Sequence, residues 1–99
     1  MKVSIENINK AFESRIRLGM MSVLMANEEV DFKELKRLLQ LTDGNLASHA
    51  KALEKEGFIE VEKKFIGRKP NTTYRATELG KEEFAKHLEA LEQLIKGNR

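Results

Sequence analysis

Five cationic side chains and no acidic one stand between residues 63 and 75: Lys63, Lys64, Arg68, Lys69 and Arg75. A cluster of this kind can neutralise phosphate groups and release their counterions, which makes binding to a polyanion depend on salt. The alternative is a solvated pair of strands whose charges have no ligand, because charge runs often form a solvent face. The formal net charge of the whole chain, +2, does not decide between the two.

Catalytic and metal-binding chemistry finds little support in the sequence. Ser48 and His49 are neighbours in an expected helix, so their side chains diverge and cannot form a nucleophile–base pair. His87 stands alone, and neither histidine has a metal-ligand spacing. The chain has no cysteine, which excludes a disulfide framework and a cysteine metal site. We therefore expect no enzyme activity, no metal and no cofactor.

The spacing of apolar residues predicts the order helix, strand stub, helix, helix, hairpin, helix. The first helical pattern begins with a segment at about 3–14, and Ser14 starts a fresh turn into a core helix from Leu18 onward. Asp31 and Thr42 are expected to cap the next two helices, because each can accept a hydrogen bond from a backbone N–H one turn on. The sequence "LLQLT" between those helices leaves room for only a very short turn.

The second half of the chain changes from helical to strand periodicity. In the helix expected over 42–56, Leu46, Ala50 and Leu53 form a buried stripe, and Gly57 ends it. Alternation then predicts a strand up to Ile66, a loose turn at 67–70 and a returning strand at 72–76. Thr77 is expected to cap a last helix at about 78–96.

These elements predict a winged helix-turn-helix, a mainly α fold with a small β-hairpin (α+β) and extended terminal helices. Residues 1–99 are expected to form one domain. Such a unit places its third helix, 42–56, in the DNA major groove and its wing, 59–76, against the backbone or the minor groove.

Three segments carry a family resemblance: "RLGMMSVLM", "DFKELKRLLQLTDGNLASHAKALEKEGFIEVEKKF" and "GRKPNTTYRATELGKEEF". Together they resemble winged-helix transcriptional regulators of the broad MarR/ArsR-like group from about residue 17 to about residue 87. The most specific part is "LASHAKALEKEGFI" followed by "GRKPNTTYRATELG". In the family this order is a recognition helix, a glycine stop, a wing with a basic tip, and Thr-x-x-Gly at the start of the last helix.

The resemblance and the charge pattern together predict three groups of DNA-contacting residues. The recognition helix would contribute Thr42, Asn45, Ser48, His49 and Lys51. The wing would contribute Lys63, Lys64, Arg68, Lys69 and Asn71. Lys33 and Lys36 of the second helix and Arg17 of the first would meet the DNA backbone, although Arg17 could instead pair with an acid on a neighbouring helix. Changing Asn45 is expected to cost about 1–3 kcal/mol at one base position.

His49 departs from the family pattern. ArsR-like sequences read "SRH" here, with a histidine that touches the DNA backbone or packs beneath it, whereas this chain reads Ala47-Ser48-His49. The departure removes one expected arginine contact. A half-buried structural histidine is the alternative to a contact with DNA.

Two apolar stripes at the ends of the chain predict a homodimer. The stripe near the C-terminal end has the spacing of a short coiled-coil seam. Both stripes reach beyond what a small three-helix core can cover. The expected interface residues are Ile5, Ile8, Phe12, Phe84, Leu88, Leu91 and Ile95. The alternative is that the two stripes pack on each other within one chain.

The expected function is that of a cytoplasmic, sequence-specific, DNA-binding transcriptional regulator acting as a homodimeric repressor. Its partners would be double-stranded DNA, a second copy of the chain and a small-molecule effector of unknown identity. No membrane partner is expected, because no signal peptide or membrane span is evident. The alternative function is a winged-helix protein-interaction module without DNA binding, which the modest net charge and Asp43 favour.

Overall fold

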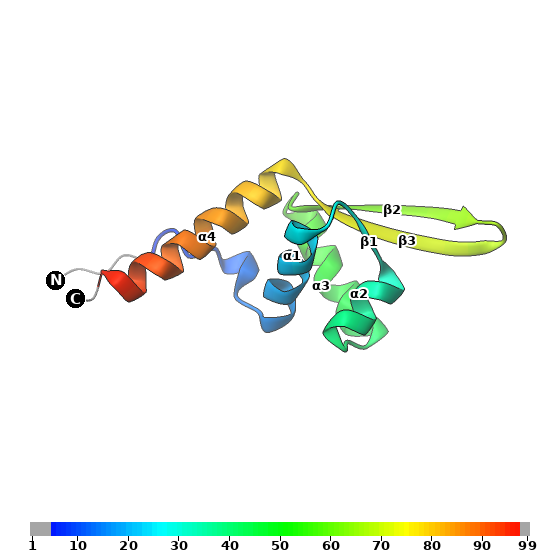
Figure 1. Cartoon of the computed structure of the whole chain (residues 1–99), viewed down its shortest axis with the longest axis horizontal. Coiled ribbons are helices and arrows are strands. Elements are labelled where there is room, and N and C mark those ends of the chain that lie inside the picture. Colours follow the sequence, from blue (N-terminus) through cyan, green and yellow to red (C-terminus); the bar gives the residue numbers. More distant parts are fainter. Residues whose placement is uncertain (1–4, 98–99) are drawn as a thin grey trace.

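The computed structural model describes residues 5–97 of the chain. Within that range the elements are the 3-10 helix η1 (Lys10–Phe12), α1 (Arg15–Ala26), β1 (Val30–Asp31), α2 (Phe32–Leu39), α3 (Asp43–Lys55), β2 (Ile59–Ile66), β3 (Lys69–Ala76) and α4 (Glu78–Lys96). Helices α1 to α3 form the body, while the β2–β3 wing and α4 extend from it in opposite directions (Figure 1). The predicted winged helix-turn-helix is confirmed.

The helix starts follow from capping side chains. The hydroxyl or carboxylate oxygen of each cap accepts a hydrogen bond from a backbone N–H three residues on, which satisfies a donor that the helix itself leaves free. The three predicted caps are confirmed: Asp31 (2.8 Å from Glu34 N), Thr42 (3.1 Å from Asn45 N) and Thr77 (2.9 Å from Gly80 N). Ser14, the expected start of a fresh turn, also caps its helix, at 3.3 Å from Arg17 N.

The sheet has the order β1-β3-β2 and is antiparallel. The short β1 pairs with β3 only at Thr73 and Tyr74, so the wing beyond this point is a free two-stranded ribbon. Lys69 pairs with Ile66, which reduces the turn expected at 67–70 to two residues. Gly67, at φ +66°, supplies the left-handed conformation that such a tight hairpin requires.

The core lies between η1, α1, α2, α3, the base of the wing and α4. The predicted stripe of α3 is buried in it. The largest fully buried side chains are Phe12, Met20, Met21, Leu24, Leu35, Leu46, Leu53 and Ile59.

The helix expected at about 3–14 is wrong within the described residues. Residues 5–9 form no helix, and only η1 follows before α1 begins. Two side chains break the pattern: Asn9 caps η1 by accepting a hydrogen bond from Ala11 N at 2.9 Å, and Ser14 caps α1. Residues 3 and 4 of the expected helix lie outside the described range.

The burial of two phenylalanines corrects part of the predicted dimer surface. Phe12 is 0% exposed and Phe84 is 2% exposed within a single chain. Their ring centroids are 5.1 Å apart in an edge-to-face arrangement, and Phe12 lies equally close to Phe58. The inner parts of the two terminal stripes therefore pack on each other. Ile5, Leu88, Leu91 and Ile95 remain exposed, and Ile8 is half-buried.

Candidate nucleic-acid interface

Helix α3 presents one buried face and one polar face. Leu46, the first member of its buried stripe, anchors the helix to the core. Asn45, Ser48 and Lys51 are exposed, and their spacing of three places them on one side of the helix. An exposed amide and hydroxyl can exchange hydrogen bonds with base edges, and an asparagine amide suits adenine.

An ion pair joins α2 to the start of α3. Lys36 Nζ lies 2.6 Å from Asp43 Oδ1, and both side chains remain partly exposed. Lys36 is one of the predicted phosphate contacts, and in the structure its charge offsets that of Asp43. The pair reduces the repulsion that Asp43 would exert on DNA at the N-terminus of α3.

Arg17 and His49 form a unit at the junction of η1, α1 and α3. Arg17 Nε donates a hydrogen bond to His49 Nδ1 at 3.0 Å, and Arg17 Nη1 donates to the carbonyl oxygen of Ala11 at 3.3 Å. Burial, followed by the charge of Arg17, lowers the pKa of His49. His49 is half-buried, and its Nδ1 carries no proton because it accepts the hydrogen bond from Arg17. This bond orients the guanidinium group of Arg17.

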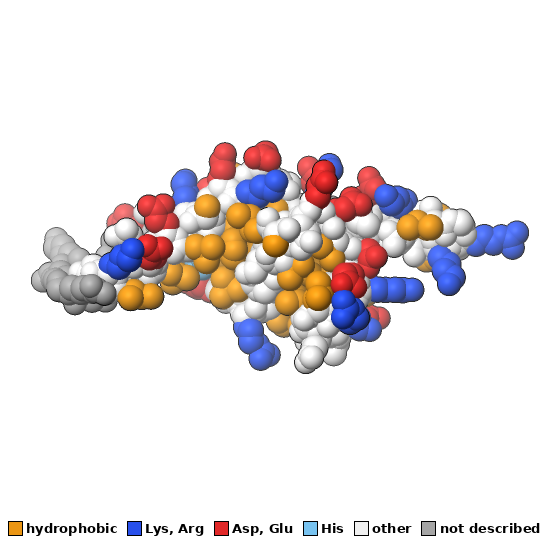
Figure 2. Space-filling view, viewed as in Figure 1, with side chains coloured by type: hydrophobic (Ala, Val, Ile, Leu, Met, Phe, Trp, Pro, Cys, Tyr) orange, Lys and Arg blue, Asp and Glu red, His pale blue; other side chains and the backbone are white. Residues whose placement is uncertain are grey.

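The wing carries both paired and unpaired cations. Arg75 Nη2 lies 2.7 Å from Glu60 Oε2, and Lys64 Nζ lies 3.1 Å from Glu62 Oε1. No ion pair within residues 5–97 involves the other three wing cations, Lys63, Arg68 and Lys69. The basic side chains at the end of the wing are visible in Figure 2. The available charge is thus concentrated toward the outer ribbon.

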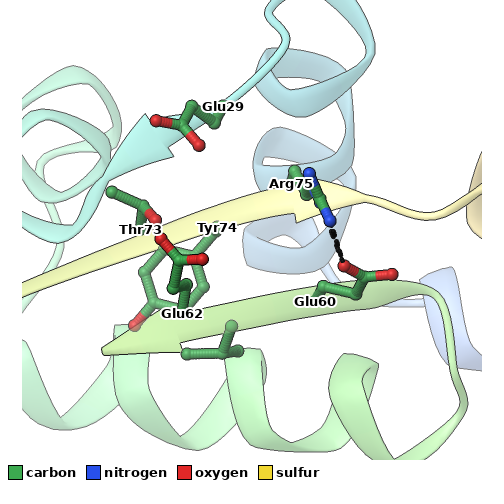
Figure 3. A pocket seen from close by; sticks show the side chains of 7 residues that line it. Glu29, Glu60, Glu62, Thr73, Tyr74 and Arg75 are labelled. Atoms are coloured by element: carbon green, nitrogen blue, oxygen red, sulfur yellow. Dashed lines mark hydrogen bonds and ion pairs between the residues drawn. The ribbon is translucent and has the colours of Figure 1, made fainter. Parts of the chain in front are cut away.

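Sequence reasoning missed the acids at the base of the wing. Glu60 stands opposite Arg75 in the strand register, and hydrogen bonding to Glu60 raises the pKa of Arg75. Glu29 and Glu62 line the same shallow hollow (Figure 3). Alternation within β2 and a two-residue turn would have identified these neighbours. The acids make the base of the wing a poor surface for phosphate.

A second hollow, of about 380 Å³, lies between α2 and the ribbon. Lys33 of α2 and Lys69 and Asn71 of β3 line it together, with Phe32 and Ile66 as apolar neighbours. The structure therefore places Lys33, a predicted backbone contact of α2, beside Lys69 and Asn71, two predicted contacts of the wing. Both lysines are exposed.

His87 ties the N-terminal segment to α4. The backbone N–H of Asn9 donates a hydrogen bond to His87 Nδ1 at 3.0 Å, so this nitrogen must be unprotonated in the fold. Burial lowers the pKa of His87, and the charge of Glu13 opposes this shift in part.

This geometry predicts that acid weakens the fold. An unfolded chain takes up a proton near the ordinary histidine pKa of about 6.5, whereas the folded chain resists until a lower pH. The free energy of unfolding, measured with urea, should therefore be lower at about pH 5.5 than at about pH 7.5. His87→Gln should be less stable than the wild type by about 1 kcal/mol near neutral pH and should show less of the acid-induced loss. An equal loss in the wild type and the variant would show that His87 does not cause it. Because the pKa of His49 is also lowered in the fold, His49→Gln should remove a separate part of the acid-induced loss.

Among residues 5–97, no group of three or more His, Asp or Glu side chains could hold a metal ion. No helix in the same range is long and apolar enough to cross a membrane.

Comparison with known proteins gives consistent matches along the chain. The profile of the winged helix DNA-binding domain family matches residues 16–95. An uncharacterized protein of Methanocaldococcus jannaschii is 37% identical over 88% of this chain and 95% of its own length. The structure of a transcriptional regulator homologue from Pyrococcus horikoshii OT3 is 33% identical, with a TM-score of 0.77, and the match covers 94% of this chain and 97% of that one.

More distant structures share the fold. A protein of Porphyromonas gingivalis W83, named as a MarR-family transcriptional regulator, has a TM-score of 0.70 at 21% identity. That match covers 94% of this chain and 95% of the other.

Proposed function

This chain belongs to the winged helix DNA-binding domain family, and from this premise we propose that it is a transcriptional regulator that binds double-stranded DNA as a homodimer and represses transcription. The observation that carries the proposal is that three wing cations have no acid partner among residues 5–97: Lys63, Arg68 and Lys69. Lys69 also lines one hollow with the exposed Lys33 of α2. Phosphate contacts need uncompensated charge of this kind.

The elements divide the task of DNA recognition. The N-terminal half of α3 enters the major groove, where Asn45 and Ser48 read base edges and Lys51 adds a charge. Arg17, oriented by His49, and Lys33 hold the backbone. The wing follows the backbone into the neighbouring minor groove. Phosphate contacts then fix the orientation, and α3 supplies the specificity.

The proposed dimer forms through α4. Leu88, Leu91 and Ile95 are exposed at spacings of three and four, which places them on one side of the helix. Exposed apolar stripes of this kind mark interfaces. A two-fold axis through α4 would place two copies of α3 about 34 Å apart, one turn of DNA, and would favour a pseudo-palindromic site.

Charges placed in this stripe should separate the dimer. Leu88→Lys with Ile95→Lys would bury two unpaired ammonium groups, and we expect the dissociation constant to rise by at least roughly a hundredfold. Sedimentation velocity across a dilution series measures the change. Gln93→Lys, on the opposite side of α4, is the matched control and should leave the dimer intact. A wild-type chain that sediments as a monomer at high concentration would show that the dimer proposal is wrong.

Salt-dependent binding tests the proposed DNA function directly. Fluorescence anisotropy with a random-sequence duplex should show affinity that falls linearly on logarithmic axes as salt rises, with a slope of about −0.9 per neutralised phosphate. A folded protein that does not bind at low salt would contradict the proposal. That result would instead favour the protein-interaction module.

A further inference from the structure

Two large apolar side chains are exposed at the end of the wing. Phe65 is 73% exposed and Ile66 is 62% exposed. They stand opposite Pro70 and Lys69 in the strand register, immediately before the Gly67 turn. Because successive strand residues point to opposite faces, the two side chains flank the ribbon on both sides near its tip.

Packing within the chain leaves most of both side chains uncovered, although Ile66 borders the hollow beside Phe32. Strand β1 stops at the Thr73 and Tyr74 level, so the outer ribbon has no third strand beside it. The proposed dimer does not cover this pair either. The wing and α4 extend toward opposite ends of a molecule that is 60 Å long (Figure 1), so a copy bound at α4 leaves the wing tip uncovered.

The charges around the pair indicate which partner covers it. Lys63, Arg68 and Lys69 lie within three residues of Phe65 or Ile66 and have no acid partner among the described ion pairs. Figure 2 shows hydrophobic side chains beside basic ones at this end of the molecule. The matching partner is a polyanion that also offers apolar surface close to its charges. Duplex DNA has this combination, because stacked base faces lie between two rows of phosphates.

We propose that the wing tip inserts Phe65 between adjacent base pairs from the minor groove, while Arg68 and Lys69 hold the flanking phosphates. An apolar wedge of this type partly unstacks a base step and bends the duplex toward the major groove. This inference rests on the proposed DNA binding and adds a physical action to it. The wing then favours flexible pyrimidine–purine steps without reading base edges.

Ring closure of short DNA measures the predicted bend. A random-sequence duplex of about 100 base pairs is shorter than the persistence length of about 150 base pairs and resists circularisation by ligase. We expect the wild-type protein to speed closure by roughly tenfold. Phe65→Ala should lose most of this acceleration when compared at equal occupancy, fixed by anisotropy, and its salt slope should match that of the wild type.

Two control variants separate the wedge from the charges and from folding. Phe65→Leu keeps an apolar wedge and should retain most of the bending. Arg68→Ala should bind more weakly with a flatter salt slope, and at equal occupancy it should still bend DNA. Because Phe65 is mostly exposed, the thermal unfolding curve of Phe65→Ala should overlay that of the wild type.

The outcomes distinguish this inference from the proposed function. Wild-type protein that binds DNA without speeding closure would overturn the wedge and leave DNA binding standing. Phe65→Ala that binds and closes rings like the wild type would also overturn it, and would assign the apolar pair to a protein partner. Wild-type protein that does not bind DNA would overturn both.

Discussion

Gly80→Ala is expected to destabilise the domain by at least about 4 kcal/mol, a loss that few single substitutions produce. A Cβ atom at residue 80 would lie 2.0 Å from the carbonyl oxygen of Phe58 and under 3.0 Å from its carbonyl carbon and Cα. All three are backbone atoms, so no side-chain rotation can relieve the clash. Chemical denaturation with urea measures the loss.

The contacts around Gly80 explain why the clash cannot be absorbed by a small shift. The same Phe58 carbonyl accepts a hydrogen bond from Thr77 N at 3.0 Å, and the Thr77 hydroxyl donates to the Gly57 carbonyl at 2.6 Å. Thr77 also caps α4. Moving α4 away from Phe58 would therefore break either the cap or the two hydrogen bonds that Thr77 makes to residues 57 and 58.

Gly44→Ala is the matched control. Gly44 lies in α3, and an added Cβ would meet no atom within 4 Å. Alanine should therefore raise stability by about 1 kcal/mol through helix propensity alone. If the free energy of unfolding of Gly80→Ala lies within about 1 kcal/mol of the wild-type value, α4 can move away from the wing without a loss of stability, which would contradict this prediction.

The elements that the sequence predicts well depend on local interactions. Capping by Asp31 and Thr42 involves a side chain and a backbone N–H only three residues away, so the residue types nearly determine the contact. The buried stripe of α3 follows in the same way from helical spacing. The sequence shows the Thr-x-x-Gly pattern, but it does not show why residue 80 must be glycine. The backbone atoms of Phe58 that a Cβ would meet lie far from Gly80 in the sequence.

The predictions that failed depend on contacts between distant segments. The spacing of Ile5, Ile8 and Phe12 fits a helix, yet Phe12 instead packs between Phe58 and Phe84. The acid-free run of the wing overstated the number of unpaired cations for a similar reason. The acid-free run ends at Arg75, but the strand register brings Glu60 opposite it from outside the run. Counting charges along the sequence does not reveal an acidic neighbour on the adjacent strand.

Arg68→Ala combined with Lys69→Ala is expected to produce the largest loss of DNA affinity, roughly ten- to a hundredfold near physiological salt. Both side chains are exposed at the wing tip, and neither has an ion pair in the described part of the chain, so their charge is fully available to phosphates. The slope of log affinity against log salt should become shallower by about 2, one unit for each lost contact. Anisotropy titrations at several salt concentrations measure both quantities.

The control must separate local contact from overall charge, because removing two cations takes the formal net charge from +2 to zero. Lys81→Ala with Lys86→Ala makes the same change on α4, where each lysine lies beside a glutamate of its own helix. If the wing binds phosphate, this control keeps the wild-type slope while the wing variant does not. If both variants weaken binding equally, the effect is one of long-range attraction, and the wing makes no direct contact. A wing variant with the wild-type slope would likewise contradict the assigned role, because a phosphate contact cannot be lost without changing the number of counterions released.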